Sequence, residues 1–237
     1  MSPSAPDPAD SLRRAAGLAA AALVQDSQTL GYGTGRAATC ALEALALRVR
    51  SGLRIRGVPT SVRTAETCRA LGLPLVSLDE VDYLDLVLDG ADEVDPQGQA
   101  LKGGGGALTR EKQVALAARE RVLVFEVTKR VPYLGATRGL PVEVLAFGWR
   151  QTLARLAALL PGVALRRGAN GAPTTSDDGG YLCDAPLVPG ADLRALARNL
   201  KQVVGVVEHG LFLDLAPTLV IGTPEGAQVV RPAASQP

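Results

Sequence analysis

Residues 84–93 have the sequence Leu-Asp-Leu-Val-Leu-Asp-Gly-Ala-Asp-Glu, an apolar run of strand length that ends in an acidic turn. Comparable apolar runs recur along the chain and alternate with Ala/Leu-rich segments of helical period. The other strand candidates are residues 29–32, 53–58 and 122–127, with a shorter one at residues 75–77. The helix candidates are residues 36–49, 64–70 and 107–119. This alternation predicts an α/β fold with a parallel sheet and helices on both of its faces.

The character of the sequence changes after about residue 137. Two helix candidates, residues 151–160 and 193–201, flank a stretch rich in Gly, Pro and Asp. The last strand candidates are residues 203–207, 211–213 and 219–221. We therefore predict a main catalytic domain formed by residues 1–136 and 210–237, and a smaller α+β domain formed by residues 137–209.

The charge balance excludes one broad class of function. Among 237 residues, 25 Lys and Arg face 24 Asp and Glu, which gives a net charge of +1. A general nucleic-acid binder carries a basic excess, so we predict no nucleic-acid partner. The cysteines, Cys40, Cys68 and Cys183, contain no C-x-x-C pair. A reducing cytosol is therefore a simpler interpretation than a disulfide framework or a zinc ribbon.

The start of the chain resembles a signal peptide in one respect, since Arg13 and Arg14 precede an apolar run at residues 15–24. That run is much shorter than the ~20 residues that a membrane span needs. We therefore predict an Ala-rich helix packed on the core, and no association with a membrane. The two ends, residues 1–9 and 231–237, are rich in Pro, Ala and Ser, which predicts disorder.

The first motif that can carry chemistry is Gly31-Tyr32-Gly33-Thr34-Gly35, between a strand candidate and a helix candidate. Ligands of parallel sheets bind beyond the carboxyl ends of the strands, and amides at a helix start attract phosphate. The motif is not a dinucleotide fingerprint, because Arg36 stands where the third glycine would be, and it lacks the lysine of a P-loop. A plain strand–helix turn explains it equally well.

The second motif is the acidic turn at residues 89–93. Asp89 and Asp92, three residues apart around a glycine, can face one pocket as acceptors for sugar hydroxyls or as acid–base groups. An Asp-rich turn that caps the next segment is an equally good explanation.

The third motif, Lys102-Gly103-Gly104-Gly105-Gly106-Ala107-Leu108-Thr109-Arg110-Glu111-Lys112, is the most informative. Four consecutive glycines lose much backbone freedom on folding, and a flexible linker would not run directly into a helix. We interpret the motif as a loop whose amides face a substrate oxygen that becomes negative, with the ammonium of Lys102 at its edge. Glu111 then lies early in the helix as a candidate general base, although a surface Glu favoured by the helix dipole is the alternative.

Two features of composition bear on the chemistry. Only four of the 25 basic residues are Lys, yet Lys occurs at positions 102 and 129, where a compact ammonium can serve in place of a guanidinium. The sole histidine, His209, lies between two strand candidates, so a structural role is favoured over a catalytic one. We therefore predict no metal site and no cofactor.

With these residues in hand, the sequence resembles the ribose-5-phosphate isomerase A family. The matching blocks, in family order and spacing, are residues 33–35, 57–61, 78–82, 89–93, 102–112, 129, 141–144 and 221–226. The resemblance implies a Rossmann-like domain with a smaller inserted α+β domain. It also implies a cytoplasmic enzyme without metal, a homodimer or tetramer, that interconverts D-ribose 5-phosphate and D-ribulose 5-phosphate in the non-oxidative pentose phosphate pathway.

The resemblance also implies residue roles. Glu111 matches the proton-transferring base, and an enediolate mechanism assigns catalytic roles to Lys102, Asp89 and Asp92 as well. The residues that match the substrate site are Thr34, Gly35, Arg36, Ala37, Asp89, Gly90, Ala91, Asp92, Lys102, Gly103, Gly104, Gly105 and Lys129.

The sequence departs from the family pattern where the phosphate is expected. Residues 33–37 are Gly-Thr-Gly-Arg-Ala where Gly-Thr-Gly-Ser-Thr is usual, so two hydroxyls are replaced by the guanidinium of Arg36 and a methyl group. Arg13 stands at a position that usually holds Lys, and Glu126 stands where Asp is usual. We expect Arg36 to hold the phosphate in a bidentate manner.

Two other classes of function remain open at this point. One is a sugar-phosphate sensor that binds with the same pocket and does not turn over. The other is an enzyme of related fold, either an amino-sugar phosphate deaminase with a catalytic His or a CoA transferase with a nucleophilic Glu.

Overall fold

The computed structural model describes Asp7 and residues 9–232, and the remaining terminal residues lie outside the described part. Most of the two segments predicted to be disordered therefore falls outside it. Within the first of them, Asp7 accepts hydrogen bonds from Arg13 and Arg36, and Ala9 begins a helix. The chain divides into two compact units: unit 1 holds residues 1–90, 114–129 and 216–237, and unit 2 holds residues 91–113 and 130–215.

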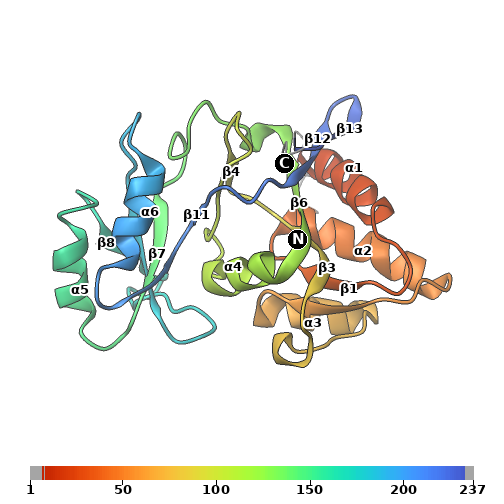
Figure 1. The fold of residues 1–237 in the computed structure, drawn as a ribbon, viewed down its shortest axis with the longest axis horizontal. Helices are drawn as coiled ribbons and strands as arrows, with labels where there is room; N and C mark the ends of the chain where they lie inside the picture. Colours follow the sequence, from red (N-terminus) through yellow and green to blue (C-terminus); the bar gives the residue numbers. More distant parts are fainter. Residues whose placement is uncertain (1–6, 8, 233–237) are drawn as a thin grey trace, which may run out of the picture. The chain divides into compact units, whose positions relative to one another are not determined.

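Unit 1 is built on a six-stranded sheet in the order β13-β12-β6-β3-β1-β2 (Figure 1). The strands are β1 (Thr29–Tyr32), β2 (Arg56–Pro59), β3 (Leu84–Asp89), β6 (Ala118–Glu126), β12 (Thr218–Thr223) and β13 (Gly226–Val230). All pair in parallel except β13, which is antiparallel to β12. The helices are α1 (Ala9–Ala22), α2 (Arg36–Arg50) and α3 (Val62–Leu71), with short 3-10 turns η1 (Leu78–Glu80) and η2 (Val127–Lys129). The predicted α/β class is confirmed.

The core of unit 1 has an apolar cluster on each face of the sheet, because side chains alternate along a buried strand. Leu86 and Leu88 of β3 pack in the cluster that includes α1 and α2 residues, whereas Val87 packs with Val114 in the other. The Ala-rich segment at the start is helical as predicted. It packs so closely on α2 that a Cβ at Gly17 would lie 2.6 Å from the carbonyl carbon of Cys40.

Unit 2 contains two antiparallel sheets. The four-stranded sheet has the order β10-β7-β9-β8, formed by β7 (Leu140–Val144), β8 (Ala164–Leu165), β9 (Tyr181–Ala185) and β10 (Val206–His209). The three-stranded sheet has the order β11-β5-β4, formed by β4 (Glu93–Val94), β5 (Ala100–Leu101) and β11 (Leu211–Phe212). Its helices are α5 (Trp149–Leu156) and α6 (Leu193–Lys201), and α4 (Leu108–Ala117) begins in unit 2 and ends in unit 1.

The units do not have the boundaries that we predicted for the two domains. Residues 91–113 belong to unit 2 because β5 pairs with β4 on one side and with β11 on the other, with Leu101 opposite Leu211. These strands have only two residues each, too few for an alternating pattern to be recognised in the sequence. The predicted short strand at residues 75–77 forms only an isolated bridge between Leu75 and Gly57. The separation into a catalytic and an inserted domain stays a prediction.

No helix within the described residues combines the length and the apolar character needed to cross a membrane.

Candidate active site

In unit 1, the predicted site residues lie where parallel strands end. Gly33 follows β1, Gly90 follows β3, and Lys129 ends the short turn after β6. The strands β1, β3 and β6 are neighbours, so their carboxyl ends share one edge of the sheet. The chain order reverses between β1 and β3, and ligands of such sheets bind at this kind of switch point.

The loop after β1 fits closely against the end of β3. The N–H of Gly33 donates to the carbonyl of Leu88 (2.9 Å), and the N–H of Thr34 donates to Asp89 Oδ1 (3.0 Å). A Cβ at position 33 would lie 2.3 Å from that same carboxylate oxygen, so only glycine fits there. Asp89 Oδ1 also accepts from the N–H of Gly90 (2.8 Å). One oxygen of this buried carboxylate therefore holds both loops at the switch point.

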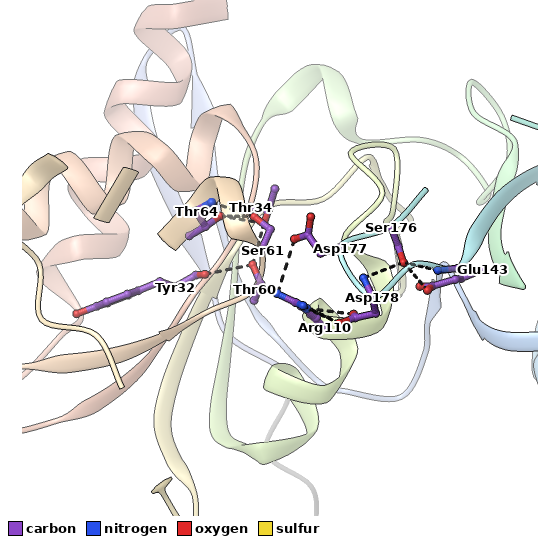
Figure 2. Close-up of polar contacts among 11 residues, drawn as sticks. Tyr32, Thr34, Thr60, Ser61, Thr64, Arg110, Glu143, Ser176, Asp177 and Asp178 are labelled. Carbon is purple, nitrogen blue, oxygen red and sulfur yellow. Dashed lines mark hydrogen bonds and ion pairs between the residues drawn. The ribbon is translucent and has the colours of Figure 1, made fainter. Parts of the chain in front are cut away.

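The hydroxyl of Thr34 belongs to a cluster of four hydroxyl groups (Figure 2). Its Oγ1 lies 2.8 Å from Thr60 Oγ1 and 3.0 Å from both Ser61 Oγ and Thr64 Oγ1. Ser61 also caps α3 by accepting from the N–H of Thr64. The side chain that we expected to contact substrate is thus engaged in anchoring its own loop. Thr60, Ser61 and Thr64 were not among the predicted site residues, although residues 57–61 were among the matching blocks.

The start of α2 carries the residues that depart from the family pattern. Gly35 is the N-cap and provides no side-chain cap, so the first amides of the helix are not covered by it. Arg36 is 67% exposed and its Nη1 donates to Asp7 Oδ2 (2.8 Å). Asp7 also accepts from Arg13, and this hydrogen bond is the main reason that the pKa of Asp7 falls to about 2. Arg36 therefore sits beside a helix N-terminus and is paired with an acidic residue from the start of the chain.

Two further departures from the family pattern are partners of each other. Arg13 of α1 donates through Nε and Nη2 to Glu126 Oε1 at the end of β6 (3.2 and 3.1 Å). Both side chains are nearly completely buried, at 4% and 6% exposure. A buried charge is tolerated only when it is paired and hydrogen-bonded, so this pair must be kept or replaced as a unit.

In unit 2, Lys102 and Glu111 form a buried ion pair. Lys102 Nζ lies 3.4 Å from Glu111 Oε1, and the two side chains are 3% and 6% exposed. The ammonium also lies 5.5 Å from the centre of the Phe212 ring, within the range of a cation–π interaction. Glu111 is in the first turn of α4, where the helix dipole favours a carboxylate. The structure thus brings together the two groups that the third motif suggested, and their roles stay predictions.

The tetraglycine segment forms a tight turn before α4. Gly103 has φ +102°, a backbone conformation that favours glycine, and its carbonyl accepts from the N–H of Gly106 (3.0 Å). The N–H of Gly104 donates to Asp92 Oδ2 (2.7 Å). This amide, one of those expected to face an oxyanion, is therefore occupied by Asp92, although Gly104 and Gly105 are both exposed residues.

The first turn of α4 is held by contacts that the sequence analysis did not predict, and Figure 2 shows those of Arg110 with Asp178 and of Ser176 with Glu143. Glu143 of β7, 1% exposed, accepts from the hydroxyls of Thr109 (2.5 Å) and Ser176 (2.6 Å). Arg110 donates to both carboxylate oxygens of Asp178 (2.6 to 3.0 Å). An acidic residue inside the apolar strand β7 was the available signal, because a buried Glu must have hydrogen-bond donors.

The third carboxylate of the acidic turn, Glu93, has a structural role. It is fully buried and accepts four hydrogen bonds of 2.5 to 2.8 Å, from the N–H groups of Gly135, Thr137 and Arg138 and from the Thr137 hydroxyl. Its acceptor capacity is thus used within the fold.

His209 is part of a buried charged network with Lys112 and Glu208. Lys112 Nζ donates to Glu208 Oε1 (2.8 Å) and to the carbonyl of His209 (2.6 Å). His209 Nδ1 lies 3.3 Å from Lys112 Nζ and from the N–H of Leu211, so two donors face this nitrogen and favour its unprotonated form. Burial, together with the charge of Lys112, lowers the pKa of His209 to about 4. These contacts agree with the predicted structural role.

This lowered pKa gives a prediction for stability. As the pH falls from about 6.5 towards 4, the unfolded chain takes up a proton at His209 that the folded chain does not, so the free energy of unfolding decreases. We expect the wild type to lose more thermal stability between pH 7.5 and pH 5 than His209→Gln, whose amide can still accept a hydrogen bond. Thermal unfolding of both proteins at the two pH values measures the difference, and equal losses would contradict the prediction.

Among Asp7 and residues 9–232, no three His, Cys, Asp or Glu side chains come together in a group that could hold a metal ion.

Comparison with known proteins identifies the family of this chain. Residues 56–226 match the sequence profile of the family described as ribose 5-phosphate isomerase A (phosphoriboisomerase A). The chain belongs to the ribose 5-phosphate isomerase A family. Ribose-5-phosphate isomerase A of Synechococcus sp. (strain JA-3-3Ab) is 47% identical over 225 residues, covering 94% of this chain and 98% of the relative. That of Roseiflexus sp. (strain RS-1) is 46% identical over 216 residues, covering 90% and 93%.

Solved structures of ribose 5-phosphate isomerases agree with the fold. The enzyme from Methanocaldococcus jannaschii has a TM-score of 0.88 at 31% identity, covering 94% of this chain and 99% of that one. A D-ribose-5-phosphate isomerase in complex with phospho-erythronic acid has a TM-score of 0.88 at 31% identity, covering 93% and 97%. The resemblance stated from the sequence is confirmed.

Proposed function

We propose that this member of the ribose 5-phosphate isomerase A family interconverts D-ribose 5-phosphate and D-ribulose 5-phosphate through an enediolate, in the non-oxidative pentose phosphate pathway. The observation that carries the proposal is the buried pair of Lys102 and Glu111, 3.4 Å apart, at the junction of a tetraglycine turn and a helix. It supplies a carboxylate base and a cationic hydrogen-bond donor, the two groups that this reaction needs.

The reaction moves one proton between neighbouring carbons. Glu111 removes the proton from C2 of the open-chain aldose, and the C2–H electron pair forms the C1–C2 double bond of an enediolate as negative charge develops on O1. Glu111 then returns the proton to C1, O1 gains a proton and O2 loses one, which gives the ketose. A single carboxylate can serve as base and acid in turn because nothing is consumed.

The developing oxyanion requires donors that are already in place. Lys102 and the backbone amides of the tetraglycine turn serve this purpose, and we assign the main backbone contribution to the amide of Gly105, since that of Gly104 donates to Asp92. Donors fixed before the reaction stabilise the transition state without the reorganisation that water would need. Asp89 and Asp92 accept hydrogen bonds from the sugar hydroxyls, with the turn residues Gly90 and Ala91 between them.

The residues that depart from the family pattern lie where we expect the phosphate of the substrate to bind. We assign it to the amides at the start of α2, residues 34–37, with charge supplied by Arg36 and Lys129. The guanidinium of Arg36 replaces the two hydroxyls that are absent from this loop.

The role of Arg36 gives a testable prediction. Arg36→Ala raises KM for ribose 5-phosphate by roughly tenfold, the worth of one charge-assisted hydrogen bond at an exposed site, and leaves kcat within about threefold. Arg54→Ala is the matched control, because Arg54 is also exposed and paired with an aspartate, Asp26. Steady-state kinetics of the wild type, Arg36→Ala and Arg54→Ala measure the change in KM. An unchanged KM in Arg36→Ala would remove this residue from the phosphate site.

We further propose that the enzyme is cytoplasmic, forms homodimers or tetramers, and needs neither a metal nor another cofactor. Size-exclusion chromatography with light scattering measures the assembly. Activity after dialysis against a chelator tests the metal, and unchanged activity is the expected result.

The test of the proposed function is ketose formation by the purified chain from ribose 5-phosphate. Binding of ribose 5-phosphate without turnover would instead indicate a sensor. Release of ammonia from an amino-sugar phosphate would indicate a deaminase, and a thioester trapped by hydroxylamine would indicate a CoA transferase.

A further inference from the structure

Arg166, which follows strand β8, joins the tetraglycine turn to the antiparallel sheet of unit 2. Its Nε and Nη2 donate to the two carboxylate oxygens of Asp184 on β9 (2.7 and 2.6 Å). Its Nη1 donates to the carbonyls of Gly103 (3.2 Å) and Gly104 (3.1 Å). The guanidinium thus uses one edge to bind a carboxylate and its remaining nitrogen to bind the turn.

The backbone of Arg166 is itself fixed. Its N–H donates to the carbonyl of Leu182 (2.8 Å), and its carbonyl accepts from the N–H of Thr174 (2.9 Å). The side chain is 19% exposed. Arg166 is therefore fixed at its backbone by the hydrogen bonds to Leu182 and Thr174, and at its guanidinium by Asp184.

These contacts determine which way the amides of the turn point. In a trans peptide the C=O and the following N–H point in opposite directions, and the described residues contain no cis peptide. With the carbonyls of Gly103 and Gly104 directed at Arg166, the N–H groups of Gly104 and Gly105 face away from it. The N–H of Gly104 indeed donates to Asp92 Oδ2 (2.7 Å), and Gly105 is an exposed residue.

A tetraglycine turn needs such a constraint more than other turns do. Without side chains, glycine peptides rotate between alternative turn conformations at little steric cost. A rotated peptide between Gly104 and Gly105 would present a carbonyl oxygen where a donor is required. A carbonyl there would repel an anionic oxygen in place of stabilising it.

We propose that Arg166, held in place by Asp184, is a positioning residue that fixes the tetraglycine turn so that the amide of Gly104 stays on Asp92 and the amide of Gly105 is directed at the oxyanion of the enediolate. Lysine cannot replace it, because one ammonium cannot bind a carboxylate side-on and two carbonyls at the same time. This inference rests on the proposed isomerase function and adds to it a residue that does not touch the substrate.

The test compares Arg166→Met with Arg194→Met. Arg194 is the matched control because it forms the same fork on Asp214 (2.8 and 2.6 Å) in the same unit and does not bind the glycine turn. We expect Arg166→Met to lower kcat by ~100-fold, as the loss of one oxyanion donor does, with KM within about threefold of the wild type. Arg194→Met is expected to leave kcat and KM unchanged.

A second readout uses phospho-erythronic acid, the compound bound in one related structure. Its carboxylate places negative charge at the position where the enediolate develops it. Arg166→Met is expected to weaken inhibition by this acid in proportion to the loss of kcat, whereas Arg166→Lys is expected to recover only part of both. A merely structural role would lower thermal stability and change the inhibitor and the substrate constants alike.

The inference and the proposed function fail in different ways. A wild-type chain without isomerase activity would overturn the function. A fully active wild type with an Arg166→Met variant that matches Arg194→Met would overturn only the inference. The ¹⁵N–¹H resonances of Gly104 and Gly105 report the turn without any assay of activity. We expect them to shift or broaden in Arg166→Met and Arg166→Lys, and unchanged resonances in both variants would also overturn the inference.

Discussion

Glu111→Gln is expected to lower kcat by about 10³- to 10⁴-fold, near the upper range for the loss of a general acid–base group, while substrate still binds. The amide cannot accept the C2 proton, but it has nearly the shape of the carboxylate and leaves the contacts of the substrate hydroxyls and phosphate in place. Because Lys102 then loses its charged partner at 3.4 Å, the free energy of unfolding also falls, by about 3 kcal/mol for a broken buried pair.

Three measurements check this result. Steady-state kinetics give kcat, and titration with ribose 5-phosphate gives the dissociation constant. Exchange of the C2 proton with deuterated solvent reports proton abstraction alone, and we expect no exchange in the variant. Glu66→Gln is the control, because Glu66 is an exposed residue of α3. A Glu111→Gln protein that isomerises at a near-normal rate would exclude this carboxylate as the base.

Lys102→Met has the second largest expected effect. It removes the cationic donor while keeping a side chain of similar length, and we expect kcat to fall by roughly 10²- to 10³-fold. The affinity for phospho-erythronic acid should fall with it, because that ligand carries the negative charge that the ammonium stabilises. Lys102→Arg is not expected to restore activity. Its guanidinium is larger and planar, and the site of Lys102 is closed by Glu111 and Phe212 with 3% of the side chain exposed.

Lys201→Met serves as the control for the loss of one lysine charge, since Lys201 is 43% exposed at the end of α6. The test of Lys102 depends on whether the substitution changes kcat or KM. If Lys102→Met raised KM and left kcat unchanged, its ammonium would bind the ground state and the transition state equally, and the assignment as an oxyanion donor would be wrong.

Much of the fold was predictable because many of its strands and helices have a recognisable apolar pattern in the local sequence. The strand at residues 29–32 and the helix at residues 193–201 occur with the predicted ends, and the strand at residues 84–88 extends by one residue to Asp89. Several of the missed strands had weak local patterns. β4, β5 and β8 have two residues each, β13 is largely exposed, β7 contains a proline, and β9 has no regular alternation of apolar and polar residues.

Parts of the candidate site were predictable for the same reason. Asp89 ends a buried strand of the parallel sheet, so its position at the edge where ligands of such sheets bind followed from order along the chain. Lys102 and Glu111 flank a glycine run that leads into a helix, and this arrangement predicted that the two side chains lie close together. The structure added that Asp89 holds the Thr34 loop, that Asp92 occupies the Gly104 amide, and that Arg36 is paired with Asp7.

The sequence by itself determined the alternation of strands and helices, the motifs at the strand ends and the family. Only the tertiary structure decided which distant side chains support those motifs. Arg166 lies more than 60 residues from the glycines that it binds, and Arg13 lies 113 residues from Glu126. The physical reason is that periodicity, capping and turn preferences act over a few residues, whereas such pairs meet only after the strands have taken their order in the sheets.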